Sequence, residues 1–531
     1  MGAARALARR TFAAARVRTL SFALLFAAYA LANAAGYTKT YPTLAGRLSF
    51  AQSFANNPAL KLFYGTPHHV ETLGGYVSWR VGGIASLVAA FFGILAAVRA
   101  LRSEEDAGRY ELVAAGALTR RAAFAARIAG IGAAVAALWL ATLVGLVAGG
   151  LLAEGSAYLA LGVVGVAAVY VGIGALASQL MPSGRGALQL AGAVFGLDFL
   201  LRAIADIANI PGLHWAAPLG WAEELHPFAG PRPAALLLPA VTTTALLVLA
   251  LALERRRDLG AGLLASLDSL GRPSASVGRL LRSPVLLALR SEWVGLALWA
   301  AATGGFAFVL GTLSNSLVSA NLGTLRQQLS KFGSGGFTTP SDVLGLYFLF
   351  FVLAVALVCC GQLAAAREEE VEGRLETLFA LPEGRTAWFA GRLALAVAGA
   401  TLVAILAGLG AALGAAAAGA SVSYPRLIEA GLNCLPASLL FLGIGALFIA
   451  AAPRQGAGAA YALVTLAFAW ELVGALLGAP AWLLGVSPFH QIGLVPAAPF
   501  RAGPAAIMLA IGAAAALAAL ARFRIRDLTG A

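Results

Sequence analysis

The feature that most constrains this chain is a succession of long apolar segments separated by short charged ones. An α-helix needs roughly 20 apolar residues to cross the hydrocarbon core of a bilayer. About twelve segments approach that length, near residues 19–36, 77–101, 122–149, 156–180, 187–207, 234–253, 291–313, 343–366, 387–418, 430–452, 457–478 and 503–521. Transmembrane β-strands would instead alternate in polarity over about ten residues. We therefore predict an all-α polytopic membrane protein with about 12 transmembrane helices.

The basic residues predict the orientation of the chain. A net charge of +13 is compatible with nucleic-acid binding, but the arginines cluster beside apolar segments, at residues 5–18, 255–257 and 522–526. The positive-inside rule predicts that such clusters stay in the cytoplasm. We therefore expect a multi-pass protein of the bacterial plasma membrane, with both termini cytoplasmic and no nucleic-acid partner. The first segment also resembles a secretory signal peptide, but a polytopic chain favours an uncleaved first helix.

The second half of the chain repeats the first. "RRRDL" at residues 255–259 corresponds to "RIRDL" at 524–528. At an offset of 265 residues, several charged residues meet an identical residue: Arg102 and Arg367, Glu104 and Glu369, Glu105 and Glu370, Arg109 and Arg374, Glu111 and Glu376, Arg127 and Arg392. Identity at charged positions is more informative than shared alanine or leucine. We therefore predict two six-span halves, residues 1–258 and 259–531, joined by a cytoplasmic linker near 254–290.

The most distinctive repeated segment is acidic and lies between two apolar ones. Its second copy reads "REEEVEGRLETLFALPEGR" at residues 367–385. On a helix, Glu105 and Arg109 lie four residues apart, as do Glu370 and Arg374, and such pairs stabilise a helix by a few tenths of a kcal/mol. One copy would indicate a solvated connector. Two copies at equivalent cytoplasmic positions favour a docking site for a duplicated or dimeric partner.

At this point the sequence resembles a known family, the permeases of ABC-2-type exporters. It is most similar to the long fused permeases described as polyketide-antibiotic or multidrug exporters. The resemblance extends over essentially the whole chain and includes "NPALKLFYG" (57–65), "REEEVEGRLETLFALP" (367–382), "PLGWAEELHPF" (218–228) and "RRRDLGAGLL" (255–264). It implies a type V exporter-like fold, in which a coupling helix after the second span of each half docks on an ATPase subunit.

This resemblance assigns candidate residues to the docking surface. The coupling helices would be residues 104–118 and 369–383, and connector helices at 3–17 and 276–289 would precede the first span of each half. The two coupling helices differ at 116–117 and 381–382, so their contacts with the ATPase need not be equal. The residues expected to dock are Glu104, Glu105, Arg109, Glu111, Glu369, Glu370, Arg374 and Glu376.

The chain lacks the motif that would let it hydrolyse ATP itself. A Walker A loop needs a lysine after glycine to hold the phosphates, and none of Lys39, Lys61 and Lys331 follows a glycine. We therefore expect no enzymatic activity and no cofactor in this chain. By the resemblance, ATP and Mg²⁺ would bind to two copies of a cytoplasmic ABC ATPase, and the substrates would be hydrophobic or amphipathic compounds such as antibiotics. The alternative is a proton-coupled multidrug antiporter of the major-facilitator type, which also has twelve spans in two halves.

Four further candidates are charged residues inside apolar segments: Asp198, Arg202, Asp206 and Glu471. Charges in a bilayer are costly, so they usually pair with one another or line a polar route. The spacing of four residues between Asp198, Arg202 and Asp206 allows a structural ladder along one helix. A place on the translocation path and a proton relay, as the antiporter would need, are the other two interpretations.

The histidines and cysteines do not indicate a metal site. All five histidines fall in segments predicted to lie on the outer side: His68, His69, His214, His226 and His490. They have neither the spacing nor the thiol partners of a metal motif, and the three cysteines form no CxxC pair. We therefore predict no metal site and attribute the histidines to interfacial or loop packing.

Overall fold

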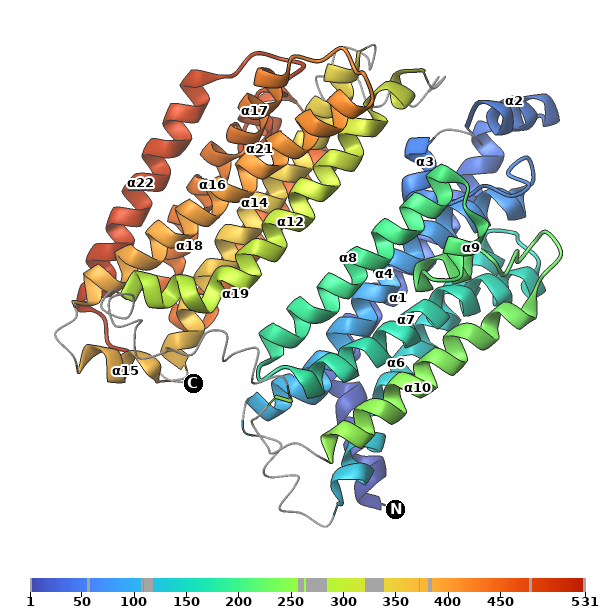
Figure 1. Ribbon diagram of the computed structural model, residues 1–531, viewed down its shortest axis with the longest axis horizontal. Helices are drawn as coiled ribbons and strands as arrows, with labels where there is room; N and C mark the ends of the chain where they lie inside the picture. Colours follow the sequence, from blue (N-terminus) through green and yellow to red (C-terminus); the bar gives the residue numbers. More distant parts are fainter. Residues whose placement is uncertain are drawn as a thin grey trace. The chain divides into compact units, whose positions relative to one another are not determined.

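The structure, a computed structural model, describes residues 2–54, 58–106, 108, 118–255, 262–263, 284–319, 339–371, 373–380, 384–476 and 480–528. Every regular element within these residues is a helix (Figure 1). Ten of the described helices are long and apolar enough to cross a membrane. The protein is therefore an all-α polytopic membrane protein, as the apolar segments predict.

These ten helices are fewer than the roughly twelve predicted spans. The two predicted spans near 187–207 and 457–478 correspond to α8 (Gly184–Ala208) and α19 (Pro453–Leu476). These helices have 25 and 24 residues, which is enough for a span at 1.5 Å per residue. Both carry ionisable residues within apolar sequence, Asp198 in α8 and Glu471 in α19.

The chain divides into two compact units, Met1–Arg272 and Pro273–Ala531, here called unit 1 and unit 2. In unit 1, α1 packs against α6, α4 against α7, and α7 against α10. Its helices are α1 (Gly2–Thr40), α2 (Leu44–Phe54), α3 (Pro58–Tyr64), α4 (Leu73–Asp106), α6 (Arg120–Ala148), α7 (Ala153–Leu180), α8, α9 (Pro211–His214), η1 (Pro218–Ala222), η2 (Pro233–Leu236) and α10 (Leu237–Glu254).

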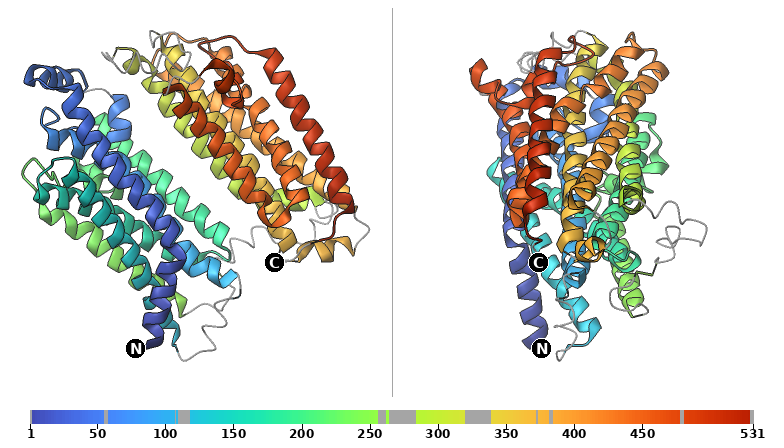
Figure 2. Two further views of the ribbon diagram at one scale, coloured as in Figure 1. Left: turned by 180° about the vertical axis from the view of Figure 1, so that it is seen from behind. Right: turned by 90° about the vertical axis from the view of Figure 1, so that its left-hand side faces the viewer.

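Unit 2 repeats this pairing of helices. There α12 packs against α16, α14 against α18, and α18 against α22, and the long helices of each unit run side by side (Figure 2). Its helices are α12 (Pro284–Ser319), α14 (Pro340–Val371), α15 (Arg374–Phe379), α16 (Arg385–Ala417), α17 (Tyr424–Leu432), α18 (Leu435–Ala451), α19, α20 (Ala481–Leu484), α21 (Pro488–Gln491) and α22 (Ala502–Ile525).

Small residues bring the first and third long helices of each unit close together. A Cβ atom on Gly145 of α6 would lie 2.5 Å from the carbonyl oxygen of Ala27 in α1. A Cβ atom on Gly410 of α16 would lie 2.1 Å from the carbonyl oxygen of Gly304 in α12. Membrane helices associate through such close backbone approaches, because burying apolar side chains gains little in lipid. The same packing device therefore holds the corresponding helix pair in both units.

The predicted connector helices differ from the structure. Residues 3–17 are the first part of α1, which continues without a break to Thr40, so the prediction of a separate connector is wrong. The physical reason is that no proline or glycine interrupts residues 3–35. Of the second predicted connector, residues 284–289 begin α12, and 276–283 lie outside the described residues, as does most of the linker.

Candidate functional site

The predicted coupling segment of unit 2 consists of two helical pieces and not one. Helix α14 ends at Val371, Gly373 adopts a left-handed conformation with φ of +72°, and α15 begins at Arg374. Glycine reaches this conformation without the penalty that a Cβ imposes, which is why it commonly terminates helices. The prediction of a single helix over 369–383 is therefore wrong, and residues 381–383 lie outside the described part of the chain.

Two of the acidic residues before this break are turned into unit 2. The carboxylate of Glu370 accepts two hydrogen bonds from Arg526 of the chain after α22, at 2.7 and 2.6 Å, and lies 2.9 Å from Arg367. Glu369 forms an ion pair with Arg392 of α16. Glu370 is only 4% exposed, so its carboxylate faces these arginines, and its docking role stays a prediction. The arginines that neutralise both carboxylates account for their burial.

Helix α15 presents the remaining charged residues at this end. Leu375 is completely buried and anchors the helix, whereas Arg374, Glu376 and Thr377 are exposed. Arg385, at the start of α16, lies over the ring of Phe379 at 5.9 Å from its centroid. Two of the predicted docking residues, Arg374 and Glu376, are therefore accessible on a short anchored helix.

The corresponding end of unit 1 has the same order of features. Arg102 pairs with Glu105 at 3.5 Å and with Asp106 at 3.1 Å, and it donates to the carbonyl oxygen of Pro182. Asp106 also accepts the backbone N–H of Gly184 at 2.7 Å, which ties α4 to the start of α8. Gly108 then has a φ of +69°. We call these ends, which carry Asp106 and Glu370, the inner ends, and the opposite ends the outer ends.

Most of the first predicted coupling helix lies outside the described residues. Arg109 and Glu111 lie outside the described residues, as do 110 and 112–117. Glu104 and Glu105 close α4 and are partly buried. Both units therefore have a buried arginine, acidic residues that pair with it and a left-handed glycine, in that order along the chain.

The charged residues of α8 lie toward the outer end of unit 1 and form only part of the predicted ladder. Arg202 lies 3.5 Å from Asp206, and the exposed fractions of these residues are 1% and 0%. Asp198 instead accepts hydrogen bonds from the Tyr170 hydroxyl at 2.6 Å and from the backbone N–H of Leu219 at 3.1 Å. The C-terminal turns of α8 are thus held by hydrogen bonds to α7 and η1, and by the Arg202–Asp206 ion pair within α8.

Glu223, directly after η1, is a member of this network that the sequence did not reveal. Its carboxylate accepts the Arg202 Nε–H at 2.6 Å and the Thr66 N–H at 3.2 Å. A Cβ atom on Gly65, where φ is +84°, would lie 2.1 Å from Glu223 Oε2, so this position requires glycine. Burial raises the pKa of the Glu223 carboxyl, and the Arg202 charge opposes that shift. In the sequence Glu223 lies in a predicted loop, so no pattern marked it as a site residue.

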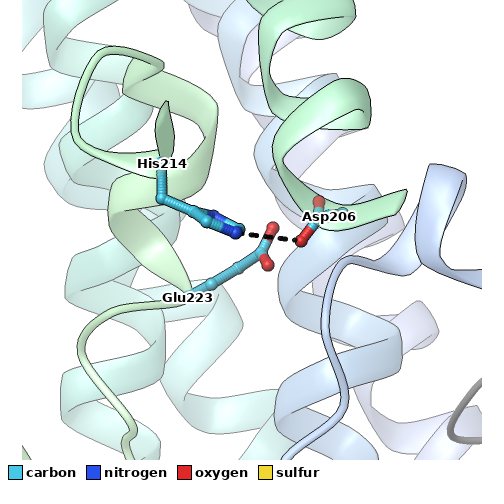
Figure 3. Close-up of side chains that lie close together, drawn as sticks. All are labelled: Asp206, His214 and Glu223. Atoms are coloured by element: carbon cyan, nitrogen blue, oxygen red, sulfur yellow. Dashed lines mark ion pairs between the residues drawn. The ribbon is translucent and has the colours of Figure 1, made fainter. Parts of the chain in front are cut away.

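His214 of α9 completes the network, and Figure 3 shows it beside the two carboxylates. Its Nε2 lies 3.5 Å from Asp206 Oδ1, which also accepts the Thr66 hydroxyl at 2.9 Å. One donor atom each of Asp206, His214 and Glu223 lies within 4.8 Å of the others, a set that could hold a divalent cation. However, Arg202 already supplies a positive charge to Glu223 and opposes a cation there. The Arg202–Glu223 ion pair and the contact of His214 with Asp206 explain the cluster.

The outer end of unit 2 has a simpler arrangement. Glu471 of α19 lies 3.1 Å from Nδ1 of His490 in α21. Glu471 is buried, and the His490 side chain is 39% exposed. This charged residue therefore pairs with a short helix that follows it, as Asp206 pairs with His214.

Comparison with known proteins identifies the family. Residues 281–524 match the family described as the C-terminal domain of the multidrug efflux system permease Rv1217c. Over 494 residues the chain is 32% identical to the multidrug efflux system permease protein Rv1217c of Mycobacterium tuberculosis, in an alignment that covers 92% of this chain and 88% of that protein. The chain belongs to this family of multidrug efflux permeases. It is accordingly a membrane component of a transport system, as predicted.

In this permease, the predicted site residues fall into two groups at opposite ends of each unit. The inner group comprises the acidic residues near the left-handed glycines, and much of it is internally paired. The outer group comprises the buried charges of α8 and α19 with their histidine partners. The docking role of the inner group and a path or relay role of the outer group stay predictions.

Proposed function

We propose that this permease is the membrane subunit of an ABC-2-type exporter with a type V-like fold. It would move hydrophobic or amphipathic compounds, such as drugs and antibiotics, out of a bacterial cell across the plasma membrane, with both termini in the cytoplasm. Two copies of a separate cytoplasmic ATPase would bind ATP and Mg²⁺ and supply the energy. The relative from Mycobacterium tuberculosis is named as part of an efflux system, which supports a chain that works with other components.

The observation that carries this proposal is the construction of α15. This helix lies across the inner end of unit 2 (Figure 1), is anchored by buried Leu375 and exposes Arg374 and Glu376. The paired hydrogen bonds between Glu370 and Arg526 join the end of α14 to the end of α22. A force on α15 would therefore reach two long helices, which is what coupling to an ATPase requires.

The test exchanges the exposed charges of α15 without changing the net charge. Arg374→Glu with Glu376→Lys should leave the permease inserted and thermally near normal, because exposed charges contribute little to stability. It should weaken ATPase binding, since charge complementarity at an interface governs association. The measurement is the stoichiometry of ATPase copurification, together with substrate-stimulated ATP hydrolysis and export in reconstituted membranes.

A matched control lies at the other end of the same unit. Arg426→Glu with Glu429→Lys makes the same exchange on α17, at the outer end, and should change neither ATPase binding nor export. Full binding and full export in the α15 variant would make α15 a simple connector. Substrate flux driven by a proton gradient in the permease alone, without any ATPase, would favour the antiporter instead.

A further inference from the structure

Unit 1 contains a cavity of about 350 Å³ between α1, α4 and α6, on the inner side of the bundle. The charged side chains that line it are Arg10, Arg18, Arg99, Arg127 and Glu104. Four arginines therefore face one glutamate, an excess of three positive charges. Within the part of the chain that the structure describes, Arg10, Arg18 and Arg99 have no carboxylate partner. Like charges gathered around a cavity repel one another, so the cavity favours an anion.

The positions of these arginines follow from the two helices that carry them. On α1, Arg10 and Arg18 are separated by eight residues, which places both on one face of the helix. On α4, Arg99 lies one turn before Ser103, which also lines the cavity. Arg18 and Arg99 lie close enough to repel each other electrostatically. The cavity therefore has two guanidinium groups, on different helices, that have no carboxylate partner among the described residues and could hold one anion between them.

The remaining lining distinguishes a lipid from a free anion. Ala96, Ile131 and Ala134 also line the cavity, so it is apolar in one part and basic in another. The α1 residues at its wall run from Leu7 to Arg18, a length of about 16 Å at 1.5 Å per residue. A single inorganic phosphate needs neither this length nor an apolar wall. A headgroup with the start of its acyl chains uses both.

The surface beside the cavity is of the kind that contacts lipid. Directly after Arg18, α1 exposes Leu20 and Leu24, with exposed fractions of 67% and 72%. Arg18 thus stands where an exposed apolar surface meets a basic one, the level at which lipid phosphates lie. Basic pockets between transmembrane helices on the cytoplasmic side suit anionic headgroups.

We propose that this cavity binds the headgroup of an anionic phospholipid from the inner leaflet, with its phosphate between Arg18 and Arg99. The guanidinium groups donate charge-assisted hydrogen bonds to the phosphate oxygens, and the apolar wall receives the glycerol end of the acyl chains. At the offset that relates the two halves, Arg99 corresponds to Ala364. The site therefore belongs to unit 1 and is not a general consequence of the repeat.

The test compares two double variants that remove the same charge from the same region. Arg18→Gln with Arg99→Gln empties the cavity of its two central charges. Arg9→Gln with Arg16→Gln removes two arginines that α1 carries outside the lining. The full-length permease is purified, and the binding of phosphatidylglycerol and of phosphatidylcholine is measured by native mass spectrometry and by the lipid-dependent shift of Tm.

We expect wild type and the Arg9/Arg16 variant to bind phosphatidylglycerol in preference to phosphatidylcholine and to gain Tm from it. The Arg18/Arg99 variant should bind phosphatidylglycerol about 30-fold more weakly, as expected for the loss of two arginines near a lipid surface. It should remain folded without lipid, because removing two like charges relieves repulsion. Equal lipid binding by the two variants would overturn the proposal. So would inorganic phosphate raising the Tm of the wild type as much as phosphatidylglycerol does, which would indicate a site for free anions.

Discussion

At the outer end of unit 1, Arg202 and Asp206 of α8 meet Glu223 and His214, which come from segments after the helix. At the outer end of unit 2, Glu471 meets His490 and the network stops there among the described residues. The inner ends are more alike, since Arg102 and Arg367 each pair with an acidic residue three positions later, ahead of a left-handed glycine.

The two units therefore resemble each other most in their helix pairing and at the inner ends, where the proposed ATPase contacts lie. They resemble each other least at the outer ends. A partner present in two copies would meet two similar surfaces, so similar inner ends are what such a partner requires. Nothing imposes that similarity on the outer ends. Among the described residues, the outer end of unit 1 has a buried network, and that of unit 2 has a single pair whose histidine is partly exposed.

The largest difference between the units should appear when their outer charges are removed. Arg202→Met leaves Asp206 and Glu223 buried without their shared cation, and loss of one partner of a buried ion pair costs about 3–5 kcal/mol. Glu471→Gln should cost about 1 kcal/mol, the value of an ordinary hydrogen bond. The free energy of unfolding, from denaturant titration of the purified permease, measures both. Similar costs for the two variants would remove the contrast between the outer ends.

The long helices could be predicted because the signal for a membrane span is local in sequence. The apolar segments near 122–149 and 503–521, for example, coincide closely with α6 (Arg120–Ala148) and α22 (Ala502–Ile525). The break at Gly373 was less visible, since a glycine within an otherwise helical acidic pattern also fits a continuous helix. Only the structure shows that this glycine is left-handed and that α15, with buried Leu375, begins directly after it.

The pairing of charges could not be predicted, because the partners are distant in the chain. Arg526 lies 156 residues from Glu370, and Thr66 lies 140 residues from Asp206. The acidic segment was therefore interpreted as exposed, whereas the structure neutralises part of it internally. Glu223 was missed for the same reason, since only the fold brings an apparent loop residue to Arg202.

A second, smaller effect should distinguish the two inner ends. Glu370→Gln removes a charge that three hydrogen-bond and ion-pair contacts hold in a buried position, and it should cost about 1.5–3 kcal/mol. Asp106→Asn changes a side chain that is 35% exposed and should cost less than about 1 kcal/mol. Thermal and denaturant unfolding measure the difference. If Asp106→Asn proves as costly as Glu370→Gln, the depth of burial does not decide stability at these ends.

The smallest difference in stability between the two units should come from four left-handed glycines, two in each unit. Gly108 and Gly373 lie at the inner ends, and Gly150 and Gly419 lie at the outer ends. A Cβ atom at any of the four would meet no atom within 4 Å, so substitution by alanine costs only the backbone conformation. That penalty is about 1–2 kcal/mol per residue, and it should be similar at all four positions.

Copurification of the ATPase should nevertheless distinguish the two inner glycine variants from the two outer ones. Changing Gly108 or Gly373 to alanine alters the direction in which the chain leaves α4 or α14, so both variants should lose ATPase copurification in addition to stability. Changing Gly150 or Gly419 to alanine should cost the same stability and leave copurification intact, which controls for destabilisation alone. Loss of the ATPase in all four variants would attribute the effect to stability. Retention in the Gly108 variant alone would show that only unit 2 docks through its glycine-linked helix, and would extend the difference between the units to their inner ends.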